Sequence, residues 1–105
     1  MFIHNSSFMI ERDKEAQFVN WLRDKIARLE ADGKLPAHSR VTAMREAGGV
    51  DYTLAEAQTV AWQTEFHTHE EARQWNSEVF ADIAAEFEHL YAPQALVFNS
   101  IFRDI

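Results

Sequence analysis

The chain has 105 residues, of which 47% are hydrophobic, 12% aromatic and 26% charged, with no cysteine and a formal charge of −7. This length suits a single domain, and the apolar fraction is large enough to fill a core, which excludes a disordered chain. The lack of cysteine excludes disulfide bridges, thiolate metal sites and cysteine nucleophiles. The acidic balance argues against binding to a nucleic-acid backbone, which requires a basic face.

The charge is unevenly distributed between the two halves of the sequence. Residues 1–45 contain eight basic and six acidic side chains, whereas residues 46–105 contain two basic and eleven acidic ones. A solvent-exposed acidic helix is the simplest interpretation. Attraction between the unlike halves across a self-association interface and electrostatic steering of a substrate are the alternatives.

No segment has the features of a targeting signal or a membrane span. The first basic residue is Arg12, so residues 1–10 lack the positive segment that begins a secretory signal, and polar residues interrupt their apolar run. The apolar stretches fall short of the ~20 residues that a membrane-spanning helix needs. We therefore expect a soluble, cytoplasmic protein.

The first half of the sequence predicts a strand, a helix and a second strand. Two apolar sets alternate in Phe2–Glu11, as is typical of a strand. A helix is predicted from Asp13, and Gly33 ends it in a left-handed conformation before Pro36 prevents it from restarting. Arg40–Ala47 is a weaker strand that leads into a Gly-Gly turn. The apolar stripe of the helix, at spacings of three and four, comprises Phe18, Leu22, Ile26 and Leu29.

The segment after the Gly-Gly turn is ambiguous. Val50–Gln58 either starts the next strand directly or forms a loop with one helical turn over Thr53–Gln58. We favour the loop, because polar and apolar residues alternate more regularly in Thr59–His67.

A second helix and a last strand complete the predicted elements. Thr68 and Glu71 form a capping box that begins a helix reaching Tyr91. Pro93 ends this helix, and Gln94–Phe102 is the final strand. The side chains expected to be buried by the second helix are Ala72, Trp75, Val79, Ile83, Phe87 and Leu90.

The order of strand, helix, strand, strand, helix, strand predicts one α+β domain over residues 1–105, with the ferredoxin-like β-α-β-β-α-β arrangement. This arrangement has an antiparallel four-stranded sheet with two helices on one face and strand order 4-1-3-2. The sets expected to face the helices are Phe8/Ile10, Val60/Trp62/Phe66 and Leu96/Phe98/Phe102. The opposite face would then carry Asn5, Gln63 and Asn99, one amide from each of three neighbouring strands.

This half-apolar face with a polar seam is larger than a monomer usually leaves exposed. We expect it to stack on a second copy, which would give a homodimer of the α/β-barrel kind. A ligand cavity lined by the three amides between two copies is the alternative, and a different strand register is another. Trp21, which lies off the apolar stripe of its helix, is a candidate interface residue, and His4 is expected to be a hydrogen-bonded core or interface residue.

The sequence contains no motif that predicts catalysis. No nucleophile elbow and no glycine-rich phosphate loop can be written with three glycines. His67 and His69 are weak candidates for a metal site, since residues two apart on a strand share a face. The capping box already explains Thr68 and Glu71, and we predict neither a catalytic residue nor a cofactor.

Five stretches of the chain resemble the bacterial domain-of-unknown-function family 4286, whose members are small proteins with a ferredoxin-like fold. The resemblance implies this fold and no particular activity. The stretches are Ile3-His4-Asn5-Ser6-Ser7-Phe8, Phe18-x-x-Trp21-Leu22, Gly48-Gly49, Val60-Ala61-Trp62-Gln63-Thr64-Glu65-Phe66 and Phe98-Asn99-Ser100-Ile101-Phe102.

Residues 75–80 and Asn5 are also similar, more weakly, to the dimeric α/β-barrel monooxygenases, some of which degrade haem. The iron-binding histidine of those enzymes would fall at Ala84 or Ala85, and His89 lies about one turn too late. We therefore expect a self-associating binding or structural module. The alternative is a dimeric oxygenase that acts on a small aromatic or haem-like ligand.

Overall fold

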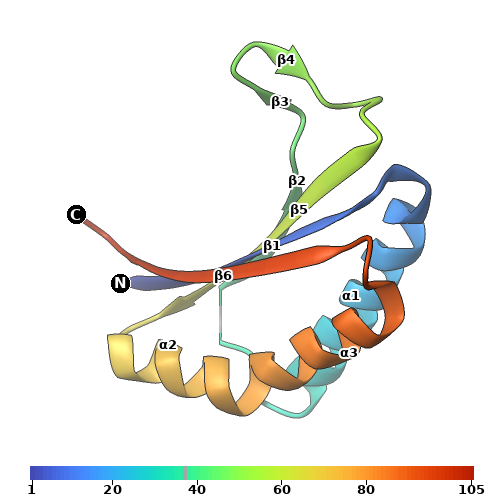
Figure 1. Cartoon of the computed structure of the whole chain (residues 1–105). Coiled ribbons are helices and arrows are strands. Elements are labelled where there is room, and N and C mark those ends of the chain that lie inside the picture. The colour runs from blue at the N-terminus through green and yellow to red at the C-terminus, as the bar shows by residue number, and fades with distance from the viewer. Residues whose placement is uncertain (37) are drawn as a thin grey trace.

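The computed structural model describes residues 1–36 and 38–105, and it places one sheet of four long strands beside two helical segments (Figure 1). Both helical segments lie on the same face of this sheet. In chain order the elements are β1 (Phe2–Glu11), the short 3-10 helix η1 (Arg12–Lys14), α1 (Glu15–Ala31), β2 (Ser39–Ala43), β3 (Glu46–Ala47), β4 (Val50–Asp51), β5 (Ala57–Phe66), α2 (His69–Trp75), the π-helical turn η2 (Asn76–Phe80), α3 (Ala81–Tyr91) and β6 (Leu96–Arg103).

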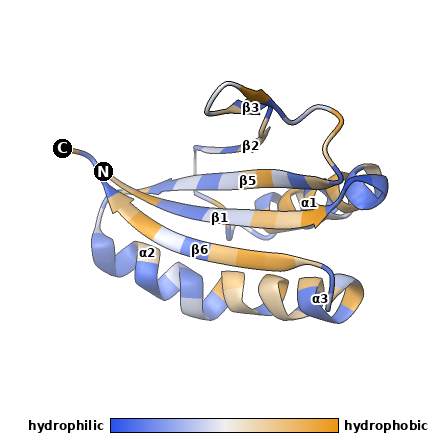
Figure 2. Ribbon diagram, turned by 45° about the horizontal axis from the view of Figure 1, so that its top comes forward, coloured by the Kyte–Doolittle hydropathy of each residue, from blue (hydrophilic) through white to orange (hydrophobic). Residues whose placement is uncertain are grey.

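The long strands follow the order β2-β5-β1-β6, and each neighbouring pair is antiparallel. β1 lies at the centre between β5 and β6. β3 and β4 form a separate small hairpin that projects from the sheet on the side away from the helices (Figures 1 and 2). The predicted α+β architecture, with a four-stranded antiparallel sheet, is confirmed.

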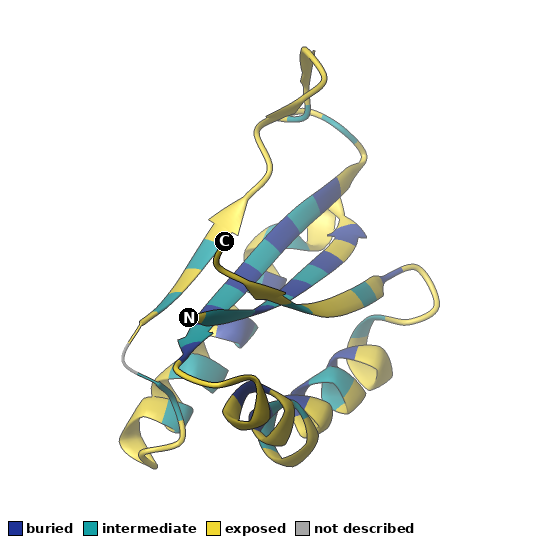
Figure 3. Ribbon diagram, turned by 90° about the vertical axis from the view of Figure 1, so that its left-hand side faces the viewer, coloured by how far each residue is buried: buried dark blue, intermediate teal, exposed yellow. Residues whose placement is uncertain are grey.

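The two central strands alternate between buried and more accessible residues along their whole length (Figure 3). The even-numbered residues of β1 and β5 face the helices, and we call this side of the sheet the covered face. Phe8, Val60 and Trp62 lie there with at most 1% of their surface exposed. The prediction for these two strands is confirmed, because each has one clearly more apolar set of alternate residues.

The predicted facing of β6 is wrong. Phe8 pairs with Val97 and His4 with Ile101, so Val97 and Ile101 pack against the core. The residues that we expected to face the helices lie on the other side of the sheet, and Asn99 lies on the covered face. Both alternate sets of this strand are apolar, so periodicity alone does not select the register. The three residues now placed outside are Leu96, Phe98 and Phe102.

The second helical segment covers the predicted range but not with one continuous α-helical period. The π-helical turn η2 separates α2 from α3. The turn adds a residue to the repeat, so the buried residue after Trp75 is Phe80, five positions later. Phe80 was absent from the expected core, Val79 is only half-buried, and Leu90 is exposed.

The segment between β2 and β5 also differs from its prediction. The helical turn expected over Thr53–Gln58 is absent, and β5 begins at Ala57. The turn at Gly48 and Gly49 is confirmed, with φ values of 57° and 78° that favour glycine. It connects β3 to β4. The strand predicted over Arg40–Ala47 is divided into β2 and β3, and β4 lies in the segment predicted as a loop.

Candidate interaction face and polar cluster

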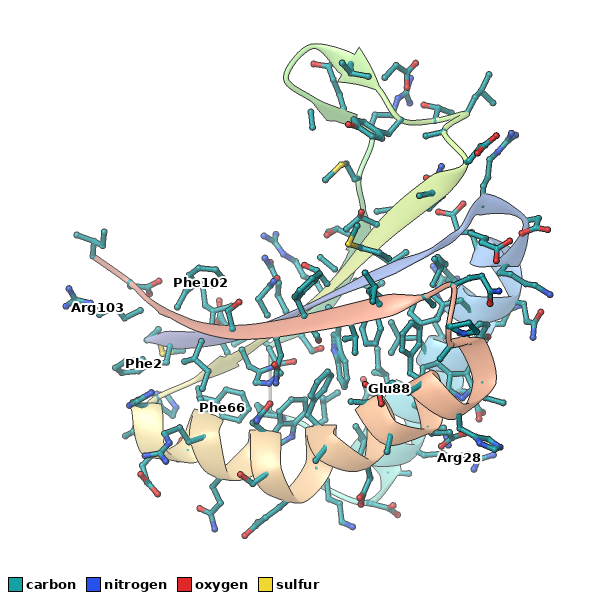
Figure 4. The ribbon with its side chains drawn as sticks, in the orientation of Figure 1. Phe2, Arg28, Phe66, Glu88, Phe102 and Arg103 are labelled. Atoms are coloured by element: carbon teal, nitrogen blue, oxygen red, sulfur yellow. The ribbon has the colours of Figure 1, made fainter. Side chains whose placement is uncertain are left out.

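The side of the sheet away from the helices, which we call the open face, has no layer of residues 1–36 or 38–105 packed on it (Figure 1). Its most exposed large apolar residues lie on β6, where Leu96, Phe98 and Phe102 are 54–58% exposed. Figure 4 shows Phe102 on this side, whereas Phe66 points from the sheet toward α2. The other long apolar side chains of the face, on β1, are Ile3 and Met9.

A chain of polar contacts crosses the middle of the open face. Asn5 on β1 is paired with Gln63 on β5, and the Gln63 amide nitrogen donates to Asn5 Oδ1 at 3.2 Å. The guanidinium Nε of Arg40 donates to Gln63 Oε1 at 3.2 Å, and the Asn5 amide nitrogen donates to Ser7 Oγ at 3.2 Å. Asn5 and Gln63 are therefore brought together as predicted, and we call this chain of contacts the amide ladder.

Asn99, the third predicted amide, does not join the ladder. Its side chain donates from Nδ2 to Asn76 Oδ1 at 2.5 Å, on the covered face. The polar seam that we expected Asn5, Gln63 and Asn99 to form on one face is therefore wrong, and so is the alternative of a ligand cavity lined by all three. The cause is the one-residue change in facing along β6, which moves every side chain of that strand to the opposite face.

A polar cluster forms instead under the helices, at the π-helical turn. Asn76 Oδ1 accepts hydrogen bonds from Asn99 and from Nε2 of His4, the latter at 2.7 Å. His4 is almost fully buried, and its ring packs on Trp75 and Phe80 with centroids 5.0 and 4.8 Å away. His4 is thus a hydrogen-bonded core residue, as expected. Asn76 was missed, because a single asparagine within a helix gives no local signal of its contacts with β1 and β6.

The environment of His4 favours its neutral form. Burial lowers the pKa of this imidazole from its ordinary value of 6.5, and the hydrogen bond to Asn76 opposes that effect. Since the amide oxygen of Asn76 can only accept, Nε2 of His4 carries a proton. The cluster therefore holds β1, β6 and the second helical segment together through a neutral hydrogen-bonded network.

Trp21 packs against the other helical segment of the same chain. It lies on α1 and contacts α3, where its indole nitrogen donates to Glu86 Oε1 at 3.0 Å and its ring packs on Phe87. Lys25 contacts the other Glu86 oxygen at 2.6 Å, and its hydrogen bond is the main reason that the pKa of Glu86 is lowered. These contacts occupy the side chain that we had singled out as an interface candidate.

His67 and His69 do not lie on one strand, because β5 ends at Phe66 and α2 begins at His69. His67 lines an open groove of about 650 Å³ beside α2, and the His69 ring packs on Phe2 with centroids 5.6 Å apart. Among residues 1–36 and 38–105, no three His, Asp or Glu side chains gather as a metal site would need. Thr68 Oγ1 accepts from the Glu71 amide at 3.1 Å, which confirms the cap.

The fold and the face together define a class, that of small α+β proteins in which helices cover one face of a four-stranded antiparallel sheet and leave the other open. The family described as "Domain of unknown function (DUF4286)" matches residues 1–105. The chain belongs to this family, as its sequence stretches predicted.

No curated protein matches the sequence. Within the part of the chain that the structure describes, no helix combines the length and the apolar character needed to cross a membrane.

Proposed function

We propose that this protein is a self-associating binding or structural module that forms a homodimer by stacking the open faces of two copies. The observation that carries the proposal is the exposed apolar row of Leu96, Phe98 and Phe102 on β6, beside the amide ladder. Large contiguous apolar surfaces are uncommon on monomers and mark sites of association. Burying this row against a second copy would remove its apolar area from water.

The size of the open face is compatible with a dimer. β1 has 10 residues, and four strands form the sheet, so strand rise and spacing give a face of roughly 600 Å². A stable interface buries about 800 Å² on each partner. The sheet faces alone therefore supply most of the area that a specific dimer needs.

The chemistry of the face also suits contact with itself. Each side-chain amide has both donors and an acceptor, so Asn5 and Gln63 of one copy can bond the same residues of another. Within the described strands, the charged side chains on this face are Glu11, Arg40 and Glu65. A face with few charges is favoured in the core of an interface over one with many.

The strand order supports the finer part of the proposal, a ferredoxin-like domain that pairs as a dimeric α/β barrel. β1 lies between β5 and β6, and β2 and β6 are the edges. This is the order 4-1-3-2 that the ferredoxin-like arrangement has when its four main strands are numbered along the chain. In a stack of two such sheets, each copy covers the open face of the other.

The test compares two leucines of similar exposure on opposite sides of the molecule. Leu96 is 54% exposed on the open face, and Leu90 is 51% exposed on α3 in the helical layer. The wild type should sediment as a dimer at micromolar concentration, Leu96→Glu as a monomer and Leu90→Glu as a dimer. A wild-type chain that stays monomeric at 100 times that concentration would refute the proposal.

A further inference from the structure

Residues 44–56 form an arm that leaves the sheet between β2 and β5 and includes the β3–β4 hairpin. The arm extends away from the helices, on the same side as the open face (Figure 1). Its base is tied to the sheet, since the buried side chain of Gln58 donates to the carbonyls of Tyr52 and Ala55 at 2.9 Å each. The Met44 amide donates to the Thr59 carbonyl at 2.9 Å. The extended position of the arm is therefore held by hydrogen bonds.

The arm presents three exposed apolar side chains in the described part of the chain. Val50 and Leu54 are 56% and 72% exposed, and Met44 is 40% exposed. The arm also carries the charged residues Arg45, Glu46, Asp51 and Glu56, so its exposed apolar side chains are three among polar neighbours. Keeping these three side chains in water costs free energy. Contact with another apolar surface would remove this cost.

The sheet pairing shows where the arm begins relative to β6. Ala43, the last residue of β2, pairs with Val60, Val60 pairs with Phe8, and Phe8 pairs with Val97. These four residues form one row across the sheet, from one edge strand to the other. The arm therefore leaves the sheet at the level of residues 96–98, but at the opposite edge.

A two-fold axis between the copies determines which part of the partner the arm meets. Suppose that two open faces stack about a two-fold axis parallel to the strands. The edge strand β2 of each copy then lies over β6 of the other, and each residue keeps its position along the strand direction. The arm then reaches the first residues of the partner's β6. An axis across the strands would instead place the arm over the partner's β2, whose open-face residues Arg40 and Thr42 are polar.

We propose that the arm clasps the second copy in the dimer and packs Val50 and Leu54 on the partner's Leu96 and the partner's Phe98. This inference rests on the proposed homodimer and specifies its symmetry axis. The contact covers the exposed apolar groups of the arm and of β6 at once. It also adds the area by which the sheet faces alone fall short of about 800 Å².

Engineered cysteines test the contact directly, because the natural chain has none. Val50→Cys and Leu96→Cys are purified separately, mixed under reducing conditions so that subunits exchange, and then oxidised. We expect the mixed disulfide to form in preference to either symmetric one. Leu90→Cys, mixed with Val50→Cys in the same way, is the control and should form at least tenfold less of the mixed disulfide.

Sedimentation of the same samples separates the two proposals. A wild-type dimer without the preferred Val50→Cys–Leu96→Cys disulfide refutes the clasp and leaves the homodimer standing. A symmetric Leu96→Cys disulfide as the main product also refutes the clasp, because the parallel axis places the two copies of Leu96 at opposite edges of the stacked sheets. A monomeric wild type refutes the homodimer itself.

A substitution in the arm provides a second measurement. Val50→Asp should raise the dimer dissociation constant about tenfold or more, because a buried apolar contact becomes a charge in an apolar site. Its circular dichroism should match that of the wild type, since Val50 is exposed in the single chain. An unchanged dissociation constant would contradict the clasp.

Discussion

The covered and open faces of the sheet are built from the same strands, yet similar residues are buried on one face and exposed on the other. Phe8 on β1 is fully buried under the helices, whereas Phe98 on the neighbouring β6 is 58% exposed on the other side. The covered face is closed within one chain and can be stable by itself. The open face carries apolar groups that a single chain leaves in water, which is why we infer that association completes it.

The polar groups of the two faces also differ in burial and in their access to water. On the covered face, the buried His4 depends on one partner, Asn76, for the hydrogen bond of its Nε2. On the open face, Asn5 and Gln63 are half-buried and reach water as well as one another. Loss of a partner should therefore cost much more on the covered face.

The largest expected effect comes from truncating the two phenylalanines. Phe8→Ala should lower the free energy of unfolding by about 3–5 kcal/mol, because it leaves a cavity among packed aromatic rings. Phe98→Ala should lower it by less than about 1 kcal/mol at low protein concentration. Urea denaturation followed by circular dichroism measures both values.

Protein concentration sharpens this comparison. The deficit of Phe98→Ala relative to the wild type should grow as concentration increases, since only the wild type gains stability from association. The deficit of Phe8→Ala should appear already at low concentration. Equal deficits for the two variants at low concentration would mean that the faces do not differ as described.

A smaller effect is expected at the polar cluster. Asn76→Ala removes the acceptor shared by His4 and Asn99 and should cost about 1–3 kcal/mol of stability, because a buried donor is left without a partner. Thermal unfolding measures the change. Asn5→Ala on the open face is the matched control, and it should cost less than half as much at low concentration. The opposite ranking would contradict the role given to the cluster.

The smallest effect is a pH dependence from His4. Burial places its pKa in the folded chain below the ordinary value of 6.5, so the unfolded chain takes up a proton first as the pH falls. Stability present above pH 6.5 should therefore be lost on acidification through that value, until the lower pKa of the folded state is reached. The slope for one imidazole is at most about 1.4 kcal/mol per pH unit.

The variant His4→Gln measures the contribution of His4 to the pH dependence of stability. Unfolding free energies between pH 7.5 and 5 should fall less steeply for it than for the wild type. His89→Gln, at an exposed position on α3, is the control for a histidine substitution outside the polar cluster. A His4→Gln profile parallel to that of the wild type would show that His4 does not contribute.

Prediction from the sequence succeeded where one pattern was dominant. The alternation in β1 and β5 correctly placed Phe8 and Trp62 inside, and it brought Asn5 beside Gln63 on the open face. The cap at Thr68 followed from a local motif that needs no tertiary contact. In each case the signal lies within a few neighbouring residues.

Prediction failed where two choices were locally equivalent. In β6 both alternate sets are apolar, so only pairing with β1 decided that Val97 faces inward and Phe98 outward. The π-helical turn leaves no clear local signal in residues 76–80, and it changed which side chains of the second helical segment are buried. The contact of Asn99 with Asn76 depends on the first of these features.

The sequence by itself determined the number and type of the main elements and the inward set of the central strands, because hydrophobic periodicity and capping act over short distances. Only the tertiary structure decided the facing of β6, the partners of His4 and the extended position of the arm. These depend on contacts between residues far apart in the chain, such as Asn76 with Asn99 and Met44 with Thr59. Register at an edge strand is an outcome of packing, and packing is a property of the whole fold.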